Sequence, residues 1–304
     1  MRMHLATMTT QKPRTIAAAA IVVIAVILAA IGPSIAPYDP ERPTADVLRP
    51  PSPAHLLGTD ASGIDVLSVV LAAFRVDILI AIVAVGVSLT VGIALGAISG
   101  YTFNGSRLAQ ALAALILRAL DLVQSIPVFI LALAIVGMVG QSIQNVVIAV
   151  AFVNMPIFAR LTRTSIRGIE PREFVSASRT IGVREVGILG WHVLPNSLDS
   201  TIANASIAIG SAILLTAGLS FLGAGVRPPT PEWGAEIATG ANYLITGEWW
   251  ISVSPGILLS IVVLGFALIG DDIRVRLQRA RREALGGITA VEQAAHITAG
   301  TEPA

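Results

Sequence analysis

EFVSASRTIGVREVGILGWHVLPN, residues 173–196, is a polar stretch between two strongly apolar parts of the chain. Its apolar residues recur every three or four positions, a spacing typical of helices with one apolar face. Gly182 interrupts the pattern, and a residue without a side chain lets the backbone turn sharply. The stretch therefore predicts two short amphipathic helices, broken near Gly182, that lie on a surface and offer a face to a partner.

The rest of the chain is apolar enough to be embedded in a membrane. Apolar residues make up 54% of the 304 residues, charged residues 13%, and the mean hydropathy is +0.79. A soluble domain carries about a quarter charged residues. The composition therefore predicts an integral membrane protein, and the apolar runs predict an all-α one.

Six apolar segments are candidate spans, since a span needs about 20 predominantly apolar residues. They are residues 16–36, 77–100, 108–139, 146–158 with its flanks, 200–221 and 251–269. The first follows three basic residues, as a signal peptide would, but it is longer than the apolar core of about 7–15 residues that cleaved signals have. We predict an uncleaved anchor rather than a signal peptide.

The basic residues predict the orientation. With the N-terminus in the cytoplasm, sixteen Lys and Arg residues fall inside and four outside, a strong positive-inside bias. The predicted parts are a cytoplasmic N-terminus (1–15), a first span (16–36), an outer Pro-rich loop (37–76), a five-helix core (77–275) with loop 160–197 inside and loop 223–250 outside, and a cytoplasmic tail (276–304). Trp249 and Trp250 in the second outer loop predict a position in the headgroup layer.

Several kinds of chemistry are excluded by the residues present. There is no cysteine, and the four histidines are scattered, so no thiol catalysis and no metal site is expected. Lys12 is the only lysine and does not stand in a G-x-x-x-x-G-K-[ST] phosphate loop. If the protein uses ATP and magnesium, a partner chain must bind and hydrolyse the nucleotide.

Two constellations lie inside the predicted spans. Gly92, Gly96 and Gly100 repeat every four residues and predict a helix face to which another backbone can approach closely. Arg118 and Asp121 are three residues apart, so they can neutralise each other on one helix face. A structural pair is the favoured interpretation, with a proton or ion relay, or a latch at the inner mouth, as the alternative. Pro127 should kink or loosen the same helix.

The polar stretch resembles the cytoplasmic coupling loop of permease subunits in ATP-binding-cassette importers, whose pattern is E-A-A, three residues, G, nine residues, I-x-L-P. Ala177, Gly182, Leu194 and Pro195 stand at the family spacing. Three positions differ, namely Ser176, Ser178 and His192. On this resemblance the coupling loop comprises Glu173, Ala177, Gly182, Leu194 and Pro195.

Three further segments resemble the dipeptide/oligopeptide/nickel branch of these permeases. HLLGTDASGIDVLS (55–68) is similar to H-x-L-G-T-D-x-x-G-R-D-V-L-S, LSFLGAGVRPPTPEWG (219–234) to L-S-F-L-G-L-G-x-x-P-P-x-P-S-W-G, and ALIGDDIRVRL (267–277) to N-L-L-G-D-x-L-R-D-x-L. They keep the family order over most of the chain. The resemblance implies a type I importer permease fold with six transmembrane helices and a cytoplasmic coupling helix, in a bacterial cell membrane.

The resemblance also implies partners and a substrate class. These are a second permease, two cytoplasmic ATPase subunits or one fused chain, and an extracytoplasmic binding protein; nucleic acid is not expected. Peptides are the favoured cargo, with nickel chelates or other small solutes left open. Two other classes remain: an ion-coupled secondary transporter or channel working through Arg118 and Asp121, and a membrane scaffold without a pathway.

Overall fold

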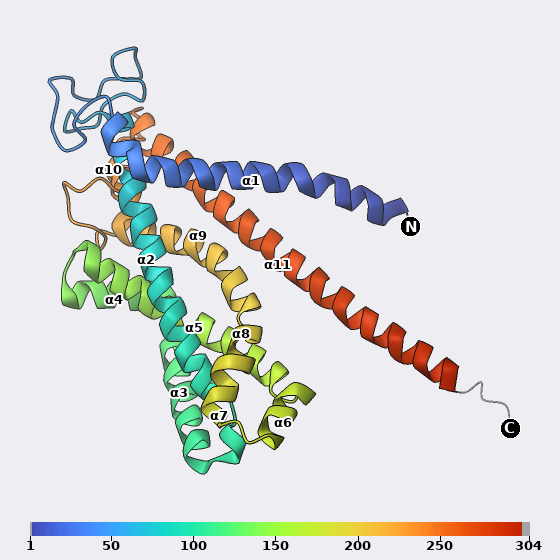
Figure 1. The fold of residues 1–304 in the computed structure, drawn as a ribbon. Helices are drawn as coiled ribbons and strands as arrows, with labels where there is room; N and C mark the ends of the chain where they lie inside the picture. The colour runs from blue at the N-terminus through green and yellow to red at the C-terminus, as the bar shows by residue number, and fades with distance from the viewer. Residues whose placement is uncertain (1, 300–304) are drawn as a thin grey trace.

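The computed structural model describes residues 2–299. Figure 1 shows an elongated bundle of helices. Six helical segments are long and apolar enough to cross a membrane: Pro13–Ile35, Val66–Gly100, Arg107–Ser125, Ile143–Ile169, Asp199–Phe221 and Trp250–Leu277. The all-α class and the predicted number of six spans are thus confirmed.

Three helices form the centre of the bundle. They are α2 (Val66–Gly100), α5 (Ile143–Ile169) and α9 (Asp199–Phe221). The glycines of α2 lie against α5: an ideal Cβ on Gly92 would lie 2.5 Å from the Phe158 Cβ, and one on Gly96 would lie 2.6 Å from the Ala159 carbonyl oxygen. Gly100 approaches the backbone of Arg163 in the same way. Because no side chain separates the two helices there, their backbones pack closely.

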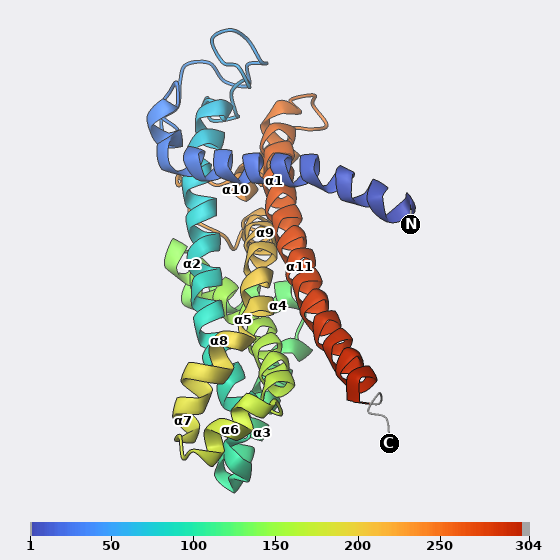
Figure 2. The same ribbon diagram turned by 45° about the vertical axis from the view of Figure 1, so that its right-hand side comes forward.

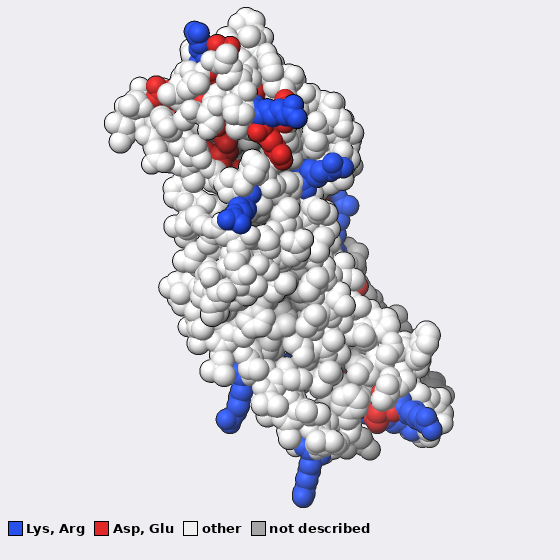
Figure 3. Space-filling model, turned by 90° about the vertical axis from the view of Figure 1, so that its left-hand side faces the viewer, with Lys and Arg blue, Asp and Glu red and all other residues white. Residues whose placement is uncertain are grey.

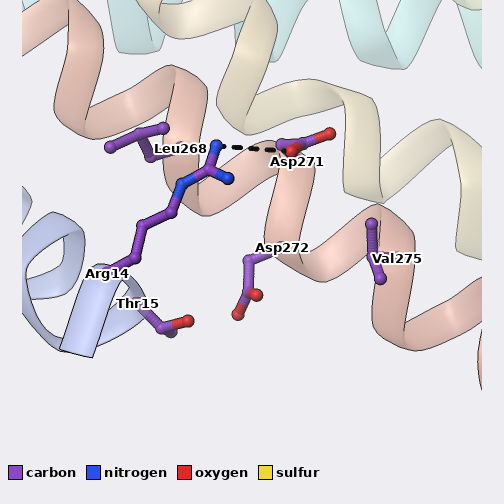
Figure 4. Close-up of a pocket in the computed structure, with 6 residues that line it drawn as sticks. All are labelled: Arg14, Thr15, Leu268, Asp271, Asp272 and Val275. Atoms are coloured by element: carbon purple, nitrogen blue, oxygen red, sulfur yellow. Dashed lines mark ion pairs between the residues drawn. The ribbon is translucent and has the colours of Figure 1, made fainter. Parts of the chain in front are cut away.

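Two helices cover one side of this centre. Figures 1 and 2 show α1 (Arg2–Ile35) crossing α2 and α11 (Trp250–Ala299). The crossing is tight, since a Cβ on Gly32 would lie 2.2 Å from the carbonyl oxygen of Leu71. In Figure 4 Arg14 of α1 points toward Asp271 of α11, with a guanidinium-to-carboxylate distance of 3.6 Å. α1 is therefore attached to the bundle by both backbone packing and charge.

The predicted third span is divided in the structure. α3 (Arg107–Ser125) ends before Pro127, and α4 (Val128–Val139) begins after it. Ile126 adopts an extended conformation (ψ 133°) between them, because the ring of a following proline disfavours the helical conformation. Proline also cannot donate a backbone hydrogen bond. Residues 108–139 are thus two helices, of which only α3 is long enough to be a span.

The predicted loops are also more structured than expected. α2 begins at Val66 rather than near residue 77, because Asp65 caps it by accepting the Ser68 amide at 2.9 Å. The loop 223–250 contains a helix, α10 (Trp233–Ala241). Trp250 is buried and donates its indole N–H to the Thr59 carbonyl at 3.1 Å, whereas Trp249 is 53% exposed. Their place in the headgroup layer stays a prediction.

The remaining short elements lie at the end opposite α10. They are η1 (Phe103–Gly105), α6 (Glu173–Thr180), α7 (Glu185–Gly187), the π-helical η2 (Ile188–Val193) and α8 (Leu194–Ser197). Figure 3 shows a broad band without charged side chains between two charged ends. We call residues 173–197 the basal segment, and residues 36–65 together with 222–249 the loop end.

Candidate functional site

The basal segment folds as two helical arms around Gly182. α6 ends in a Schellman motif, in which the amides of Gly182 and Val183 donate to the carbonyls of Arg179 (3.0 Å) and Ser178 (3.1 Å). Gly182 has φ +83°, a left-handed conformation that costs glycine least. The sequence prediction of two short helices broken near Gly182 is confirmed.

Arg179 holds the two arms to the bundle. Its Nε donates to Glu185 Oε1 at 3.1 Å, across the Gly182 turn. Its Nη2 donates to Glu170 Oε1 at the end of α5 and to the Tyr101 hydroxyl at the end of α2, both at 3.2 Å. One guanidinium therefore joins both arms of the basal segment to the ends of two central helices, a task suited to its fixed fork of donors.

The end of α2 completes the cluster. The Tyr101 hydroxyl donates to Glu185, and the guanidinium carbon of Arg179 lies 5.7 Å from the Tyr101 ring centroid. The Thr102 amide donates to Glu170 Oε1 at 3.1 Å. Glu170 is buried, so these donors compensate for the water that its carboxylate has lost.

Charge in this cluster is stable around neutral pH. Burial raises the pKa of Tyr101 to about 12, and its hydrogen bond to Glu185 acts in the same direction. Burial alone would raise the pKa of Glu185, but hydrogen bonds from Tyr101 and Arg179 bring it below its usual value. The hydrogen bond to Glu185 raises the pKa of Arg179 in spite of burial. The cluster is therefore a permanent ionic connection rather than a titrating site.

The basal segment has one buried and one exposed apolar side. Val175, Ile188 and Val193 are buried in a small core with residues from the ends of α2 and α5. On the other side Ile181 is 79% exposed, Val186 73% and Trp191 82%. These three lie outside every candidate span, and exposed apolar patches are typical of a protein-contact surface.

The sequence-predicted coupling residues are placed on this segment, though not in one contact. Glu173 lies exposed in the first turn of α6, and Ala177 in its middle. Leu194, half-buried, and Pro195, exposed, begin α8. The sequence analysis missed Arg179, Glu170 and Tyr101. The spacing of Arg179 and Glu185 across Gly182 was the one local signal for that cluster.

The predicted partner of Asp121 is corrected by the structure. The Asp121 carboxylate lies 2.5 Å from Nη2 of Arg160 on α5, whereas Arg118 is exposed and forms no ion pair among the residues that the structure describes. A helix neighbour three residues away can pair, but a side chain from a packed helix can equally reach the same carboxylate. The ion pair therefore joins α3 to α5 instead of lying along α3.

At the loop end, the predicted motif 55–68 folds as a cap on α2. His55 is buried, with Nδ1 2.8 Å from Asp65 Oδ1 and Nε2 3.6 Å from Asp46 Oδ2, and its ring stacks on Tyr38. The other Asp65 oxygen accepts the Ser68 hydroxyl at 2.7 Å. Within the described residues no group of three or more His, Cys, Asp or Glu could hold a metal ion.

Known proteins resemble the chain over most of its length. The family described as binding-protein-dependent transport system inner membrane component matches residues 92–283. The probable D,D-dipeptide transport system permease protein DdpC of Escherichia coli (strain K12) is 37% identical over 263 residues, 86% of each chain. The di/tripeptide transport system permease protein DppC of Pseudomonas aeruginosa (strain UCBPP-PA14) is 39% identical over 256 residues, 82% of each.

One solved structure has the same fold at lower sequence similarity. A chain of the MetNI methionine ABC transporter, in an inward facing conformation, superposes with a TM-score of 0.56 at 22% identity. The match covers 68% of the present chain and 95% of that one. It shows a shared permease fold.

Proposed function

This chain belongs to the family of binding-protein-dependent transport system inner membrane components, and on that premise we propose that it forms part of the translocation pathway of an ATP-binding-cassette importer for small peptides. The named relatives transport dipeptides and tripeptides. The proposed partners are a second permease, a pair of ATPase subunits or one fused chain, and an extracytoplasmic binding protein. ATP and magnesium are used by the ATPases.

The observation that carries the proposal is the exposed apolar side of the basal segment. Ile181, Val186 and Trp191 are exposed and lie outside the candidate spans. A groove on an ATPase is the proposed cover. Arg179 connects this surface to the ends of α2 and α5, so a push on the segment is passed to helices at the centre of the bundle.

The proposed orientation places the basal segment in the cytoplasm and the loop end outside. The positive-inside bias supports it. Ser52→Cys and Ser178→Cys, introduced singly into this cysteine-free chain, are to be treated in intact cells with an impermeant thiol reagent. Reaction at position 52 and protection at 178 is expected; the reverse pattern overturns the orientation.

The coupling role is tested in proteoliposomes that contain the whole complex. Ile181→Asp and Val186→Asp should weaken ATPase copurification and uptake of a labelled dipeptide, because each places a charge in the proposed contact. Leu56→Asp is the matched control, since Leu56 is also exposed but lies at the loop end. Equal losses in all three variants would refute the docking surface. Uptake driven by an ion gradient without any ATPase would favour the secondary-transporter alternative.

A further inference from the structure

Two carboxyl groups are buried together where α10 meets α2. Asp77 lies on α2 and is 0% exposed, and Glu232, the residue before α10, is 1% exposed. Their carboxyl groups accept hydrogen bonds from three successive backbone amides, those of residues 233–235. Glu232 stands where the importer pattern quoted above has a serine, so this pair is a departure of the present chain from the pattern it resembles.

Both carboxyls converge on the first turn of α10. Asp77 Oδ2 accepts the Trp233 amide at 3.2 Å. Glu232 accepts the amides of Gly234 (3.0 Å) and Ala235 (2.7 Å) as the N-terminal cap. A helix N-terminus offers the equivalent of about half a positive charge, which compensates one buried carboxylate in part and cannot compensate two.

Two buried carboxyl oxygens around α10, Asp77 Oδ1 and Glu236 Oε1, have no hydrogen-bond partner among the described residues. Nearly all buried polar atoms in proteins are hydrogen-bonded, and each exception requires an explanation. A proton on either Asp77 or Glu232 supplies the missing donor, because a carboxylic acid can donate to a neighbouring carboxylate.

Positive side chains do not fill this role. Among the described residues, none of the carboxyls around α10, namely Asp60, Asp77, Glu232 and Glu236, forms an ion pair with a basic residue. Arg75 and Arg227, the nearest in sequence, are exposed. α9 and α11 contribute only hydroxyls, from Thr216, Ser220 and Ser252.

The environment of Glu236 agrees with this reading. Burial, together with the charge of Asp60, raises the pKa of Glu236 to about 8. Burial also raises the pKa of Asp60, against three backbone hydrogen bonds. Glu236 therefore keeps its proton at neutral pH, since a dry site opposes charge.

We propose that Asp77 and Glu232 form a proton-binding site, in which one shared proton fastens α10 to α2. Two ionised carboxylates bound to successive backbone amides repel each other, whereas a carboxylic acid and a carboxylate attract. Trp233, fully buried and bonded through its indole N–H to the Val70 carbonyl at 3.1 Å, is held in place by the same contact. Loss of the proton releases the start of α10 from α2.

The first test detects the proton by infrared spectroscopy of the full chain in its complex at pH 7. Asp77→Asn keeps an acceptor for the Trp233 amide and supplies a permanent donor to Glu232, so it mimics the protonated pair. The difference between wild type and this variant should contain the carbonyl band of one protonated carboxylic acid. Glu41→Gln, which neutralises an exposed carboxylate, should show no such band. Its absence in the Asp77→Asn difference overturns the proposal.

The second test follows thermal unfolding between pH 5 and pH 8. Unfolding releases the shared proton into water, so the wild-type midpoint should fall as the pH rises. The unfolding midpoints of Asp77→Asn and Glu232→Ser should each fall less steeply with pH, by the contribution of one proton. The midpoint of Glu41→Gln should follow that of the wild type. A parallel decline in wild type and Asp77→Asn refutes the proton site. A midpoint raised by sodium, potassium or calcium in the wild type alone would show a metal cation in its place.

Discussion

The two ends of the molecule bury carboxyl groups in opposite ways. Where the basal segment meets the bundle, Glu170 and Glu185 meet the guanidinium of Arg179, so three helices are joined by opposite charges. Where α10 meets α2, Asp77 and Glu232 accept the backbone amides of α10, without an ion pair to a basic side chain among the described residues. Glu170, Asp77 and Glu232 are all buried; a cation satisfies the first, and a shared proton is our proposal for the other two.

This difference sets how each end responds to its surroundings. A carboxylate held by arginine keeps its charge over a wide pH range, because the guanidinium does not deprotonate. A carboxyl pair held by a shared proton, as we propose for Asp77 and Glu232, changes charge when that proton is lost. The basal segment is therefore built as a constant mechanical joint, and the contact of α10 with α2 depends on the pH that reaches it.

The largest expected effect is at Glu236. Its pKa in the folded protein is about 8, against 4.5 for an unperturbed glutamate. Between these values the unfolded chain has lost the proton that the folded chain keeps, so the free energy of unfolding falls as pH rises and levels off above 8. The slope is about 1.4 kcal/mol per pH unit.

Glu236→Gln should remove that slope and leave the variant more stable than wild type near pH 8. The measurement is chemical unfolding of the purified complex at several pH values. Glu173→Gln, an exposed residue of the basal segment, is the control and should follow the wild type. A slope as steep in Glu236→Gln as in the wild type would place this titrating proton elsewhere and weaken the contrast between the ends. A smaller remaining slope is the contribution expected from the proposed Asp77–Glu232 proton.

The next effect is at Arg179. Arg179→Met leaves Glu170 and Glu185 without their cation, and breaking a buried pair in this way costs about 3 kcal/mol. The loss should appear at all pH values from 6 to 9, in contrast to the loop end. Thermal unfolding and ATPase copurification are the measurements. Arg184→Met, an exposed arginine of the same segment, should be nearly neutral; equal losses in both variants would remove Arg179 from its central role.

Much of this arrangement could be predicted from sequence, and the remainder depends on distant contacts. The spans follow from apolar length, and the break at Gly182 from a glycine inside an amphipathic pattern. The Arg179 cluster could not be predicted, because Tyr101 lies 78 positions away. Arg118 was predicted as the ion-pair partner of Asp121 because it lies three residues away on the same helix. The partner in the structure is Arg160, 39 positions along the chain. α10 was missed because prolines precede its capping residue.

The Asp121–Arg160 pair is an intermediate case, with opposite charges in the spanning part of the bundle. Asp121→Asn should cost about 2 kcal/mol, since it leaves a guanidinium unpaired in a membrane-spanning helix. Arg160→Gln in addition should recover most of the loss, whereas Arg118→Gln should not. Expression, assembly and dipeptide uptake are the measurements. Rescue of Asp121→Asn by Arg118→Gln would support the pairing of Asp121 with Arg118 that the sequence predicted. An Asp121→Asn/Arg160→Gln variant that assembles well but does not transport would make the pair part of the working pathway.

The smallest effect isolates the backbone of the basal segment from its charges. Gly182 has φ +83°, and no atom lies within 4 Å of the position that a Cβ would take. Gly182→Ala therefore costs only the left-handed conformation, about 1 kcal/mol, and Gly182→Asn costs less because asparagine tolerates that region. Gly187→Ala is the control, since Gly187 has φ −68°.

The informative quantity is peptide taken up per ATP hydrolysed, alongside the thermal midpoint. If the turn only connects two arms that Arg179 already holds, Gly182→Ala lowers the midpoint slightly and leaves the ratio unchanged. If the angle between the arms transmits the push of an ATPase, the ratio falls while the charged cluster stays intact, and Gly182→Asn recovers it. If the peptide taken up per ATP is unchanged in Gly182→Ala, the Arg179 cluster alone connects the basal segment to the bundle. The two ends would then differ further, one held by an arginine and the other by the proposed proton at α10.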